Sequence, residues 1–574
     1  MKSPWSFATS PRSPNVVIER FIPLKRFDKQ PYNKELQIKI GKHIRENSNK
    51  KVGLKSHNSQ LDFVARDFLT RTPKKLGLIF VPGVDKGDLI FTEQGNNLIK
   101  TKYPNFIMQR QIAKWQYPSP NSAKGTSHLE IIPLTSIIYI LKQVKDLSRT
   151  ELATFVGTLE SYKDIDNIIN NILNLRIEIK NTKGNLKRRN LRKEESLKQM
   201  KIYYKNEINK TIREKKGKQV TEEIFYIKKY QNHKDYADAA FRYFLSTGLF
   251  KINKRSKLEI SNLNKLDAEY LLKTIGIKPA KIKMDIQDYV FNFLGKEKSI
   301  KIFSDDEENL NMKLEYLSDN AKKIGLESSF YKVNFLKTDS LDNKNGIIID
   351  FEKKINYMKM ENYIKELSLR KNIDFQDILE LFDNIKNNEV EILDRPLQYE
   401  WNFFRIFSFI GGFKKIIPSL KFDEDVNPLH TSSSVPDLII EYENFSLIVE
   451  VTLTVGARQY EAEGAPVFRH VGKYQKENPN KRVFGLFVAD KLDINMPIEF
   501  LSRAQVNTNL YDGKVKILPM DRLRFSDLFS KIYKDKLDYN FILNIFNEML
   551  SDNVLEEFRI KGEVEWIKKL DKLC

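Results

Sequence analysis

The clearest alternation of apolar and polar residues lies near position 440, where two short apolar runs flank two polar residues. The runs cover 438–442 and 445–451, and Glu443-Asn444 separates them. Short apolar runs joined by a two-residue turn are typical of a β-hairpin. Pairing about this turn predicts that Asp437 and Glu450 lie directly opposite each other on neighbouring strands.

The rest of the C-terminal part also alternates between strand and helix patterns. Apolar runs at 482–489 and 514–519 predict two further strands. Helices are expected from Glu400, from Pro466, which suits the first position of a helix, and from about Met520. Strands separated by helices indicate an α/β sheet, which we expect to be mixed.

Two segments in the N-terminal half share a layout typical of winged-helix domains. In the first, a helix precedes two short apolar runs joined by a polar tip at 85–88, and Thr92 can cap the next helix. In the second, Ser148 and Glu151 have the spacing of a capping box. An Ala-rich helix there ends at Gly248, and a second hairpin follows.

Charges that alternate on a helical period between about 290 and 390 indicate a helical linker. We therefore expect a multidomain chain, which its length of 574 residues also favours. The expected regions are winged-helix-like α+β subdomains at 1–145 and 146–290, an α-helical linker at 291–390, and an α/β domain at 391–574.

The composition favours a folded protein with a polyanionic partner. The chain is 41% hydrophobic and carries a formal net charge of +21, which points first to nucleic acid. The basic background of an AT-rich genome would give the same surplus. The densest basic run, at 185–193, marks either a solvated helix face or one laid on phosphates.

Cysteine and histidine usage argues against several kinds of site. Cys574 is the single cysteine of the sequence, and the six histidines lack metal-ligand spacing, so neither a disulfide within the chain nor a zinc centre is expected. No apolar run approaches the length of a membrane span or resembles a signal peptide. We therefore expect no membrane partner and a cytoplasmic location.

The paired acids of the predicted hairpin are the first candidate site. Two carboxylates on one sheet face, here Asp437 and Glu450, suit an oxygen-seeking cation such as Mg²⁺. Thr452 follows Glu450 by two residues and therefore points to the same face. A solvated hairpin with scattered acids is the alternative, but the strongly apolar strands and the proline before Asp437 favour the site.

Two N-terminal segments are candidate DNA contacts. Arg12 is framed by prolines, and a stiff backbone suits a positioned contact, although a loop that caps the domain core is an equal alternative. Lys114, Trp115, Gln116 and Tyr117 combine groups that can read base edges. A core tryptophan before a helix-ending proline explains the same residues.

Several short motifs occur in an order that resembles one family. An acid-bearing helix, Pro-Asp, a hairpin and Glu-Val-Thr together resemble the core of PD-(D/E)XK nucleases. The order along the whole chain is similar to that of the AlwI-like type IIS restriction and nicking endonucleases. The motifs are Ser10-Pro-Arg-Ser-Pro14, Lys114-Trp-Gln-Tyr-Pro118, Ala237-Asp-Ala-Ala240, Arg242-Tyr-Phe244, Thr247-Gly-Leu-Phe250, Pro436-Asp437, Glu450-Val-Thr452 and the segment from Pro466 to His470.

The resemblance implies a site-specific, Mg²⁺-dependent deoxyribonuclease. Its two N-terminal subdomains would recognise a short asymmetric DNA site, and its C-terminal PD-(D/E)XK domain would cleave several base pairs away. Arg242 lies in one matching motif and joins Arg12 as an expected DNA contact. The site residues at matching positions are Glu400, Asp437, Glu450, Glu463 and His470.

The expected roles follow from the chemistry of these side chains. Asp437 and Glu450 would hold the metal, with the Val451 carbonyl as a third oxygen. Glu463 and His470 would orient or deprotonate the attacking water or hold a second metal, because imidazole accepts protons near neutral pH.

Two further positions have more than one expected role. Glu400 would be a metal ligand or a neighbouring acid, or only a helix-start acid favoured by the helix dipole. Thr452 stands where the superfamily usually has lysine, and a hydroxyl supplies no cationic group. Thr452 would therefore orient a water or its neighbours, which leaves the identity of the general base open.

The expected partner is double-stranded DNA, together with a cognate DNA methyltransferase of the same system. One chain holds one site, so cutting both strands would need a homodimer, a small nuclease subunit or sequential nicks. One alternative is a DNA-binding regulator whose nuclease-like domain is inactive. Another is a structural or repair protein that binds DNA ends.

Overall fold

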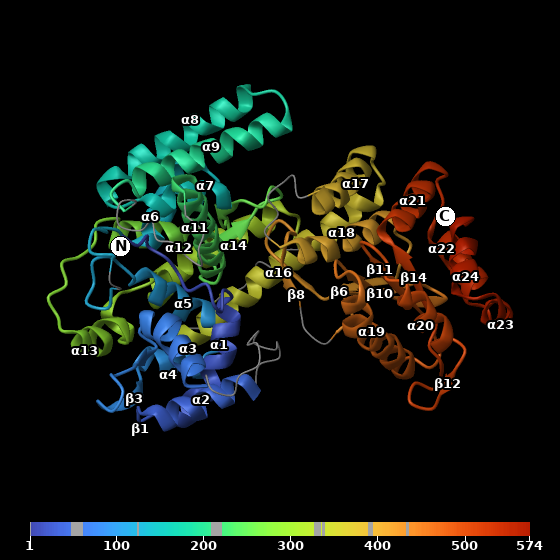
Figure 1. Cartoon of the computed structure of the whole chain (residues 1–574), viewed down its shortest axis with the longest axis horizontal. Coiled ribbons are helices and arrows are strands. Elements are labelled where there is room, and N and C mark those ends of the chain that lie inside the picture. Colours follow the sequence, from blue (N-terminus) through green and yellow to red (C-terminus); the bar gives the residue numbers. More distant parts are fainter. Residues whose placement is uncertain are drawn as a thin grey trace. The chain divides into compact units, whose positions relative to one another are not determined.

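The computed structural model describes residues 2–46, 61–122, 125–207, 221–326, 335, 339–387, 394–431 and 435–573 (Figure 1). The chain divides into two compact units, Met1–Glu352 and Lys353–Cys574, and helix α16 (Leu341–Ser368) contributes to both. This division is coarser than the four regions expected from the sequence, whose boundaries stay predictions.

The first N-terminal segment contains the helix, short strands and polar tip that the pattern predicts. Thr92 Oγ1 accepts a hydrogen bond from Gly95 N at 3.1 Å, so the predicted cap begins helix α4. Strand β1 joins the two predicted strands in a sheet of order β1-β3-β2. The winged-helix assignment itself stays a prediction. The elements are α1 (Pro14–Phe21), β1 (Gln30–Pro31), α2 (Lys34–Glu46), α3 (Leu61–Lys75), β2 (Ile79–Phe80), β3 (Asp88–Phe91), α4 (Glu93–Lys100) and α5 (Pro104–Ala113).

The second segment begins with the predicted capping box. Ser148 Oγ accepts from Glu151 N at 3.1 Å, and Glu151 Oε2 accepts from Ser148 N at 2.8 Å. Gly248, with φ of +76°, turns the chain between the last helix and the predicted hairpin, where Phe250 pairs with Ile260. The elements are α6 (Pro133–Val144), α7 (Arg149–Thr154), α8 (Ile165–Asn181), α9 (Asn185–Tyr203), α11 (Glu222–Leu245), β4 (Phe250–Ile252) and β5 (Leu258–Ile260).

The segment expected to be a helical linker is helical in its described parts. A buried ion-pair network joins two of its helices to a preceding helix, because Lys313 Nζ on α14 lies 2.8 Å from Asp267 on α12 and 3.0 Å from Glu352 on α16. Loss of either acid would leave a buried charge with less compensation. The helices of the segment besides α16 are α14 (Glu307–Lys323) and α17 (Asn372–Asn387), and α12 (Lys265–Ile275) and α13 (Ile286–Asp288) precede it.

A five-stranded mixed sheet organises the second unit, in the order β14-β11-β10-β9-β6. β10 is parallel to β11 and β11 to β14, whereas β9 runs antiparallel to both β10 and β6. The predicted mixed sheet is therefore confirmed. The strands of the unit are β6 (Lys415–Pro418), β7 (Leu420–Phe422), β8 (Pro428–Thr431), β9 (Leu438–Glu441), β10 (Phe445–Thr452), β11 (Arg482–Ala489), β12 (Asn507–Thr508), β13 (Gly513–Lys514) and β14 (Ile517–Asp521).

Helices cover both faces of this sheet (Figure 1). Leu447 and Val449 of β10 share an apolar cluster with α18 (Arg395–Ile410), α21 (Arg522–Lys534) and α22 (Tyr539–Leu550). Ile448 packs instead with α19 (Ala457–Glu477) and α20 (Asn495–Arg503). Because strand residues alternate between faces, Glu450 and Thr452 lie on the α19 side. The remaining helices are α23 (Asp552–Lys561) and α24 (Glu563–Asp571).

Pro466 does not begin a helix, and that prediction is wrong. α19 begins nine residues earlier, at Ala457, after Gly456 in the left-handed region with φ of +66°. Val467 and Val471 are buried against the sheet, so apolar packing just after Pro466 offsets the one missing N–H. Gly485 of β11 permits this close packing, since an added Cβ would lie 2.8 Å from Val471 Cγ2.

Two other helix starts differ from the sequence expectation. α18 begins at Arg395, where Asp394 Oδ1 accepts from Leu397 N at 3.3 Å, so Glu400 lies inside the helix and is no helix-start acid. α21 begins at Arg522 because β14 extends to Asp521, which caps the helix. None of the helices in the described residues is both long and apolar enough to cross a membrane.

Candidate active site

The two acids of the predicted hairpin face each other across β9 and β10. Leu438 pairs with Val449, and one further step of the same register places Asp437 opposite Glu450, as predicted. Asp437 Oδ2 accepts a hydrogen bond from Val451 N at 2.8 Å, which fixes its side chain beside β10. Glu450 is 9% exposed, so one carboxylate of the pair is nearly enclosed.

Helix α19 brings two more of the predicted residues to the C-terminal end of β10. His470 Nδ1 lies 2.5 Å from Glu450 Oε1. Glu463 Oε1 accepts hydrogen bonds from Thr452 Oγ1 at 3.2 Å and from Thr454 Oγ1 at 3.4 Å. Glu463 and His470 are seven residues apart and therefore share one face of the helix.

Gln459 fixes the loop between β10 and α19, and the sequence analysis missed it. The side chain is fully buried and its Nε2 donates to Thr454 O at 2.6 Å and to Lys491 O at 3.1 Å. Its Oε1 accepts from Asp493 N at 2.8 Å. Thr454 was missed as well, although its position two residues beyond Thr452 is a signal for a hydroxyl near the same face.

Glu400 adds a third carboxylate to the electrostatics of this site. Burial, followed by repulsion from Asp394 and Glu450, raises the pKa of Glu400 to about 8. Burial and repulsion from Glu450 and Glu400 hold the pKa of Asp437 well above its usual value. Burial also raises the pKa of Glu450, and the bond to His470 opposes that rise. The acids therefore destabilise one another's ionised forms.

This donor set fits a hard divalent cation. Carboxylate oxygens are the ligands that such ions prefer, and a cation would relieve the repulsion that raises these pKa values. Glu400 Oε2 is buried and has no hydrogen-bond partner in the described part of the chain.

The carboxylates are not already gathered around one point. Within the described ranges, no group of three or more His, Cys, Asp or Glu side chains has an arrangement that could hold a metal ion. One oxygen of Asp437 and one of Glu450 are engaged by Val451 N and His470, which leaves the second oxygen of each for a ligand.

The two arginines expected to contact DNA lie in one cluster in the first unit. Arg12 Nη2 lies 3.0 Å from Asp235, and Arg12 Nη1 lies 3.4 Å from Asp238. Arg242 and Arg149 also pair with Asp238, at 3.3 and 3.1 Å. The side chains of Arg12 and Arg242 are 44% and 31% exposed, so both reach the surface, and their DNA contacts stay predictions.

The other four expected DNA contacts are buried, which is incompatible with reading base edges in this conformation. Lys114 Nζ donates to Leu294 O at 2.9 Å and to Lys296 O at 2.6 Å, and burial lowers its pKa to about 7. Gln116 Nε2 donates to Ala280 O at 2.6 Å. The alternative of a core segment fits this placement. The exposed fractions of Lys114, Trp115, Gln116 and Tyr117 are 2%, 7%, 5% and 4%.

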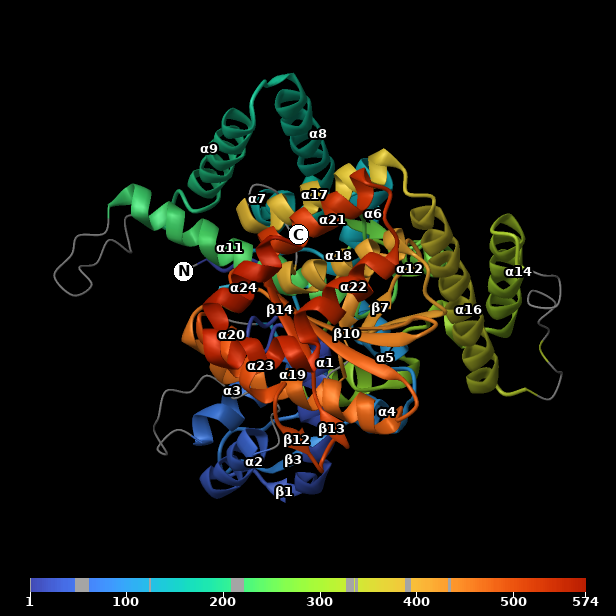
Figure 2. The ribbon, with the colours of Figure 1, turned by 90° about the vertical axis from the view of Figure 1, so that its right-hand side faces the viewer.

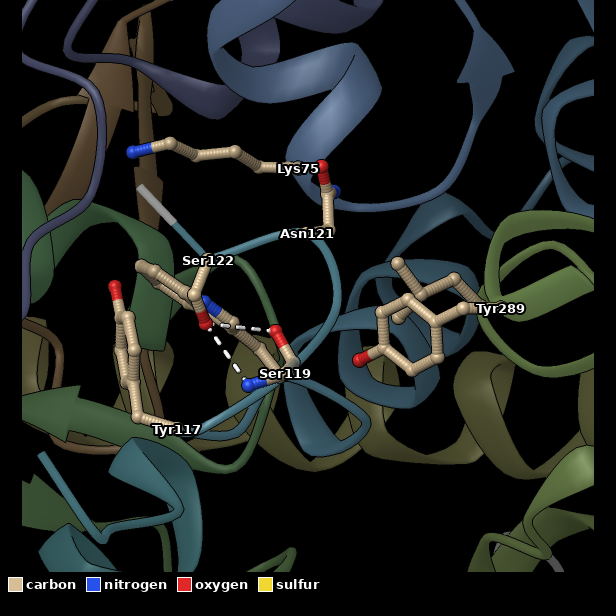
Figure 3. Close-up of a pocket in the computed structure, with 8 residues that line it drawn as sticks. Lys75, Tyr117, Ser119, Asn121, Ser122 and Tyr289 are labelled. Atoms are coloured by element: carbon tan, nitrogen blue, oxygen red, sulfur yellow. Dashed lines mark hydrogen bonds between the residues drawn. The ribbon is translucent and has the colours of Figure 1, made fainter. Parts of the chain in front are cut away.

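A small pocket lies beside this segment, and two residues of its lining are hydrogen-bonded to each other (Figure 3). Trp115, Tyr117 and Lys75 contribute to its lining. Ser122 Oγ accepts from Ser119 N at 2.9 Å and bonds to Ser119 Oγ at 3.0 Å. The pocket therefore belongs to the packing of this core segment.

Comparison with known proteins places the chain in a family. A model of the AlwI restriction endonuclease family matches residues 74–528. Curated proteins give no significant match. Two similar solved structures are the small subunit (R.BspD6I2) of the heterodimeric restriction endonuclease R.BspD6I and the BpuJ1 endonuclease binding domain in complex with pyrene- and phenanthrene-modified DNA.

Both structural likenesses are distant. The R.BspD6I2 subunit is 24% identical, with 34% of this chain and 98% of that chain covered and a TM-score of 0.29. The BpuJ1 domain is 14% identical, with 50% and 91% covered and a TM-score of 0.29. The family match, in contrast, spans well over half of the chain and includes both the hairpin and α19. The chain belongs to the AlwI restriction endonuclease family.

Proposed function

We propose that this chain is a Mg²⁺-dependent DNA endonuclease of type IIS, which hydrolyses a phosphodiester at a fixed distance from a short asymmetric sequence. The observation that carries the proposal is the convergence of Asp437, Glu450, Glu463 and His470 at the C-terminal end of strand β10, in a chain of a restriction endonuclease family. A PD-(D/E)XK nuclease would hold its metal at the same place.

Asp437 and Glu450 would hold the cation through the carboxylate oxygens that face away from Val451 N and His470. The Val451 carbonyl and Glu400 are the further oxygen donors of this proposal. When bound, the cation would polarise the phosphoryl oxygen and lower the pKa of a water near it. Glu400 would release its proton as the cation binds, because its pKa without the ion is about 8.

His470 is the residue we propose to take a proton from the attacking water. While Glu450 is ionised it can only accept hydrogen bonds, so His470 Nδ1 carries the proton and Nε2 is left with its lone pair. Glu450 thus sets the tautomer in which the outer nitrogen can act as a base. Glu463, oriented by Thr452 and Thr454, would position that water or hold a second cation.

Recognition is proposed for the first unit and cleavage for the second. A chain with these tasks in separate units suits cleavage away from the recognised sequence, and the net charge of +21 favours DNA as the partner. One site per chain would nick one strand. Cleavage of both strands would then need a homodimer, a small nuclease subunit or sequential nicks, and a cognate methyltransferase would protect host DNA.

A regulator with an inactive nuclease-like domain is the competing function. The presence of the whole set argues against it, because Asp437 lies opposite Glu450 and Glu450 contacts His470.

The decisive experiment is cleavage of plasmid DNA with Mg²⁺, followed by mapping of the new ends on both strands. Ends at one fixed offset from a shared short sequence support the type IIS proposal, and the mapping distinguishes nicking from double-strand cutting. Purified wild-type protein that binds one sequence specifically but leaves every plasmid intact would support the regulator instead.

A further inference from the structure

The α8–α9 hairpin carries a basic segment that the candidate active site does not use. We call residues 177–194, the end of α8 and the first half of α9, the basic arm. Figures 1 and 2 both show this end of the hairpin standing out from the rest of the first unit. Its charged residues are Lys180, Lys183, Lys187, Arg188, Arg189, Arg192 and Lys193, against Glu178 and Glu194.

The basic arm is exposed along its length. None of its described side chains is buried. No ion pair involves any of its basic residues in the part of the chain that the structure describes; Arg188 Nε donates to the Thr182 carbonyl instead, at 2.7 Å. Seven positive and two negative charges thus share a projecting surface that is not neutralised by the described protein.

One face of α9 is buried where the helix packs on the rest of the unit, and it is exposed and charged beyond that point. Ser196, Met200 and Tyr203 follow a spacing of four and three residues and therefore share one stripe. All three are buried, and Ser196 Oγ lies 2.7 Å from Thr154 Oγ1 of α7. This stripe is the one that packs α9 onto the unit.

The same stripe continues into the basic arm as positive charge. Arg192 and Lys193 lie four and three residues before Ser196, and Arg189 lies one turn further. All three are exposed. A helix that packs along its whole length would carry apolar residues at these positions. The stripe is instead cationic where the protein no longer covers it, so its complement is an anionic surface from outside the described chain.

We propose that the basic arm binds the phosphate backbone of duplex DNA outside the recognised sequence, mainly through Arg189, Arg192 and Lys193. The inference rests on the proposed function, because duplex DNA is the anionic partner that a DNA endonuclease meets. Phosphate contacts fix the position of a protein on the duplex without reading bases. The arm therefore contributes affinity and register to any DNA sequence.

The test measures binding of purified full-length protein to a fluorescent mixed-sequence duplex of about 30 base pairs over a range of salt concentrations. The stripe variant is R189Q/R192Q/K193Q. The matched control, K198Q/K201Q/K205Q, makes the same charge change at exposed lysines near the body end of α9. Each phosphate contact adds about 0.9 to the slope of log K against log salt, so the stripe variant should lose roughly 2–3 from the slope magnitude.

At about 0.1 M salt this change corresponds to binding weaker by roughly one hundredfold or more, whereas the control should lose well under one from the slope. Both variants should melt at the wild-type temperature, since they change exposed side chains. Stripe and control variants with equal slopes would overturn the proposal. Stripe-dependent binding to phosphatidylserine vesicles with an unchanged duplex slope would overturn it too. If the wild type shows no salt-dependent duplex binding, the proposed function itself fails.

Discussion

His470 Nδ1 lies 2.5 Å from Glu450 Oε1, a contact that joins helix α19 to strand β10. The contact links a candidate metal ligand to the candidate base, so the ionisation state of Glu450 determines which nitrogen of His470 carries the proton. An ionised Glu450 holds the proton on Nδ1 and leaves Nε2 as acceptor. The two residues are twenty positions apart in the chain, and the turn into α19 brings them together.

Replacement of His470 should impair chemistry more than DNA binding. H470A and H470N should lower the cleavage rate by about 10²–10⁴-fold, the usual contribution of a general base. Duplex affinity should stay within about twofold, since the ring is engaged by the Glu450 carboxylate. Single-turnover cleavage and gel-shift assays measure the two effects. K473A, at an exposed position one turn away, is the control.

Full activity of both His470 variants at neutral pH would remove the residue from the mechanism. Rescue of H470A by added imidazole would support the proton-transfer role, because a merely structural histidine has no reason to respond to a soluble base.

Thr452 and Glu463 should behave as one functional unit. Their side chains are joined by a 3.2 Å hydrogen bond, so T452A should misplace Glu463 and lower cleavage about 10–100-fold, as with other residues that orient a site. T452S keeps the hydroxyl and should stay near the wild-type rate. In the double variant T452A/E463Q the losses should be far from additive, as a double-mutant cycle of cleavage rates can show. Additive losses would mean that the hydroxyl acts elsewhere.

Glu400 should make stability depend on pH in a cation-sensitive way. Its folded pKa of about 8 lies above the ordinary value of 4.5. The stability it contributes is therefore fully present below about pH 4.5 and is lost as the pH rises through about 8. E400Q should lose less stability than wild type over this window, by a difference on the order of 1.4 kcal/mol per pKa unit.

Mg²⁺ should reverse this loss, because it replaces the proton as the partner of the acids. The rise in melting temperature on adding Mg²⁺ should be larger at pH 8.5 than at pH 6, where protons compete. Melting curves of wild type and E400Q at both pH values, with Mg²⁺ or EDTA, make the test. A Mg²⁺ shift that is independent of pH would contradict the assignment of Glu400 to the cation site.

The segment 114–117 should behave as protein core. W115A should destabilise the protein by about 3–5 kcal/mol. The side chain is 7% exposed, and its ring centroid lies 4.3 Å from that of Phe7. A stable W115A that binds a different sequence would restore the base-reading role.

R12Q, at an exposed arginine, should keep the melting temperature and weaken specific binding by about 1–3 kcal/mol.

The sequence predicted the site best where local pattern decides the structure. A two-residue turn between apolar runs has one register that buries its apolar face, and this register places Asp437 opposite Glu450, in agreement with the structure. The capping box at Ser148 and the cap at Thr92 are equally local and equally well predicted.

Where tertiary packing decides the structure, the sequence pattern was not enough to predict it. Pro466 looks like a helix start, but burial of Val467 and Val471 stabilises a helix that continues through this proline. Lys114 has the chemistry of a DNA contact, yet the carbonyls that enclose it come from residues about 180 positions away. Gln459 has no local signal, because its partners lie on two separate loops.

The central claim is that the hairpin acids carry out the cleavage. The most direct measurement compares D437N and E450Q with wild type in a supercoiled-plasmid assay with Mg²⁺, alongside specific-duplex binding. E441Q, which removes one charge from the same hairpin where Glu441 pairs with Lys481, is the matched control. We predict no cleavage by D437N or E450Q, retained binding, and wild-type cleavage by E441Q. Undiminished cleavage by D437N or E450Q would contradict the account.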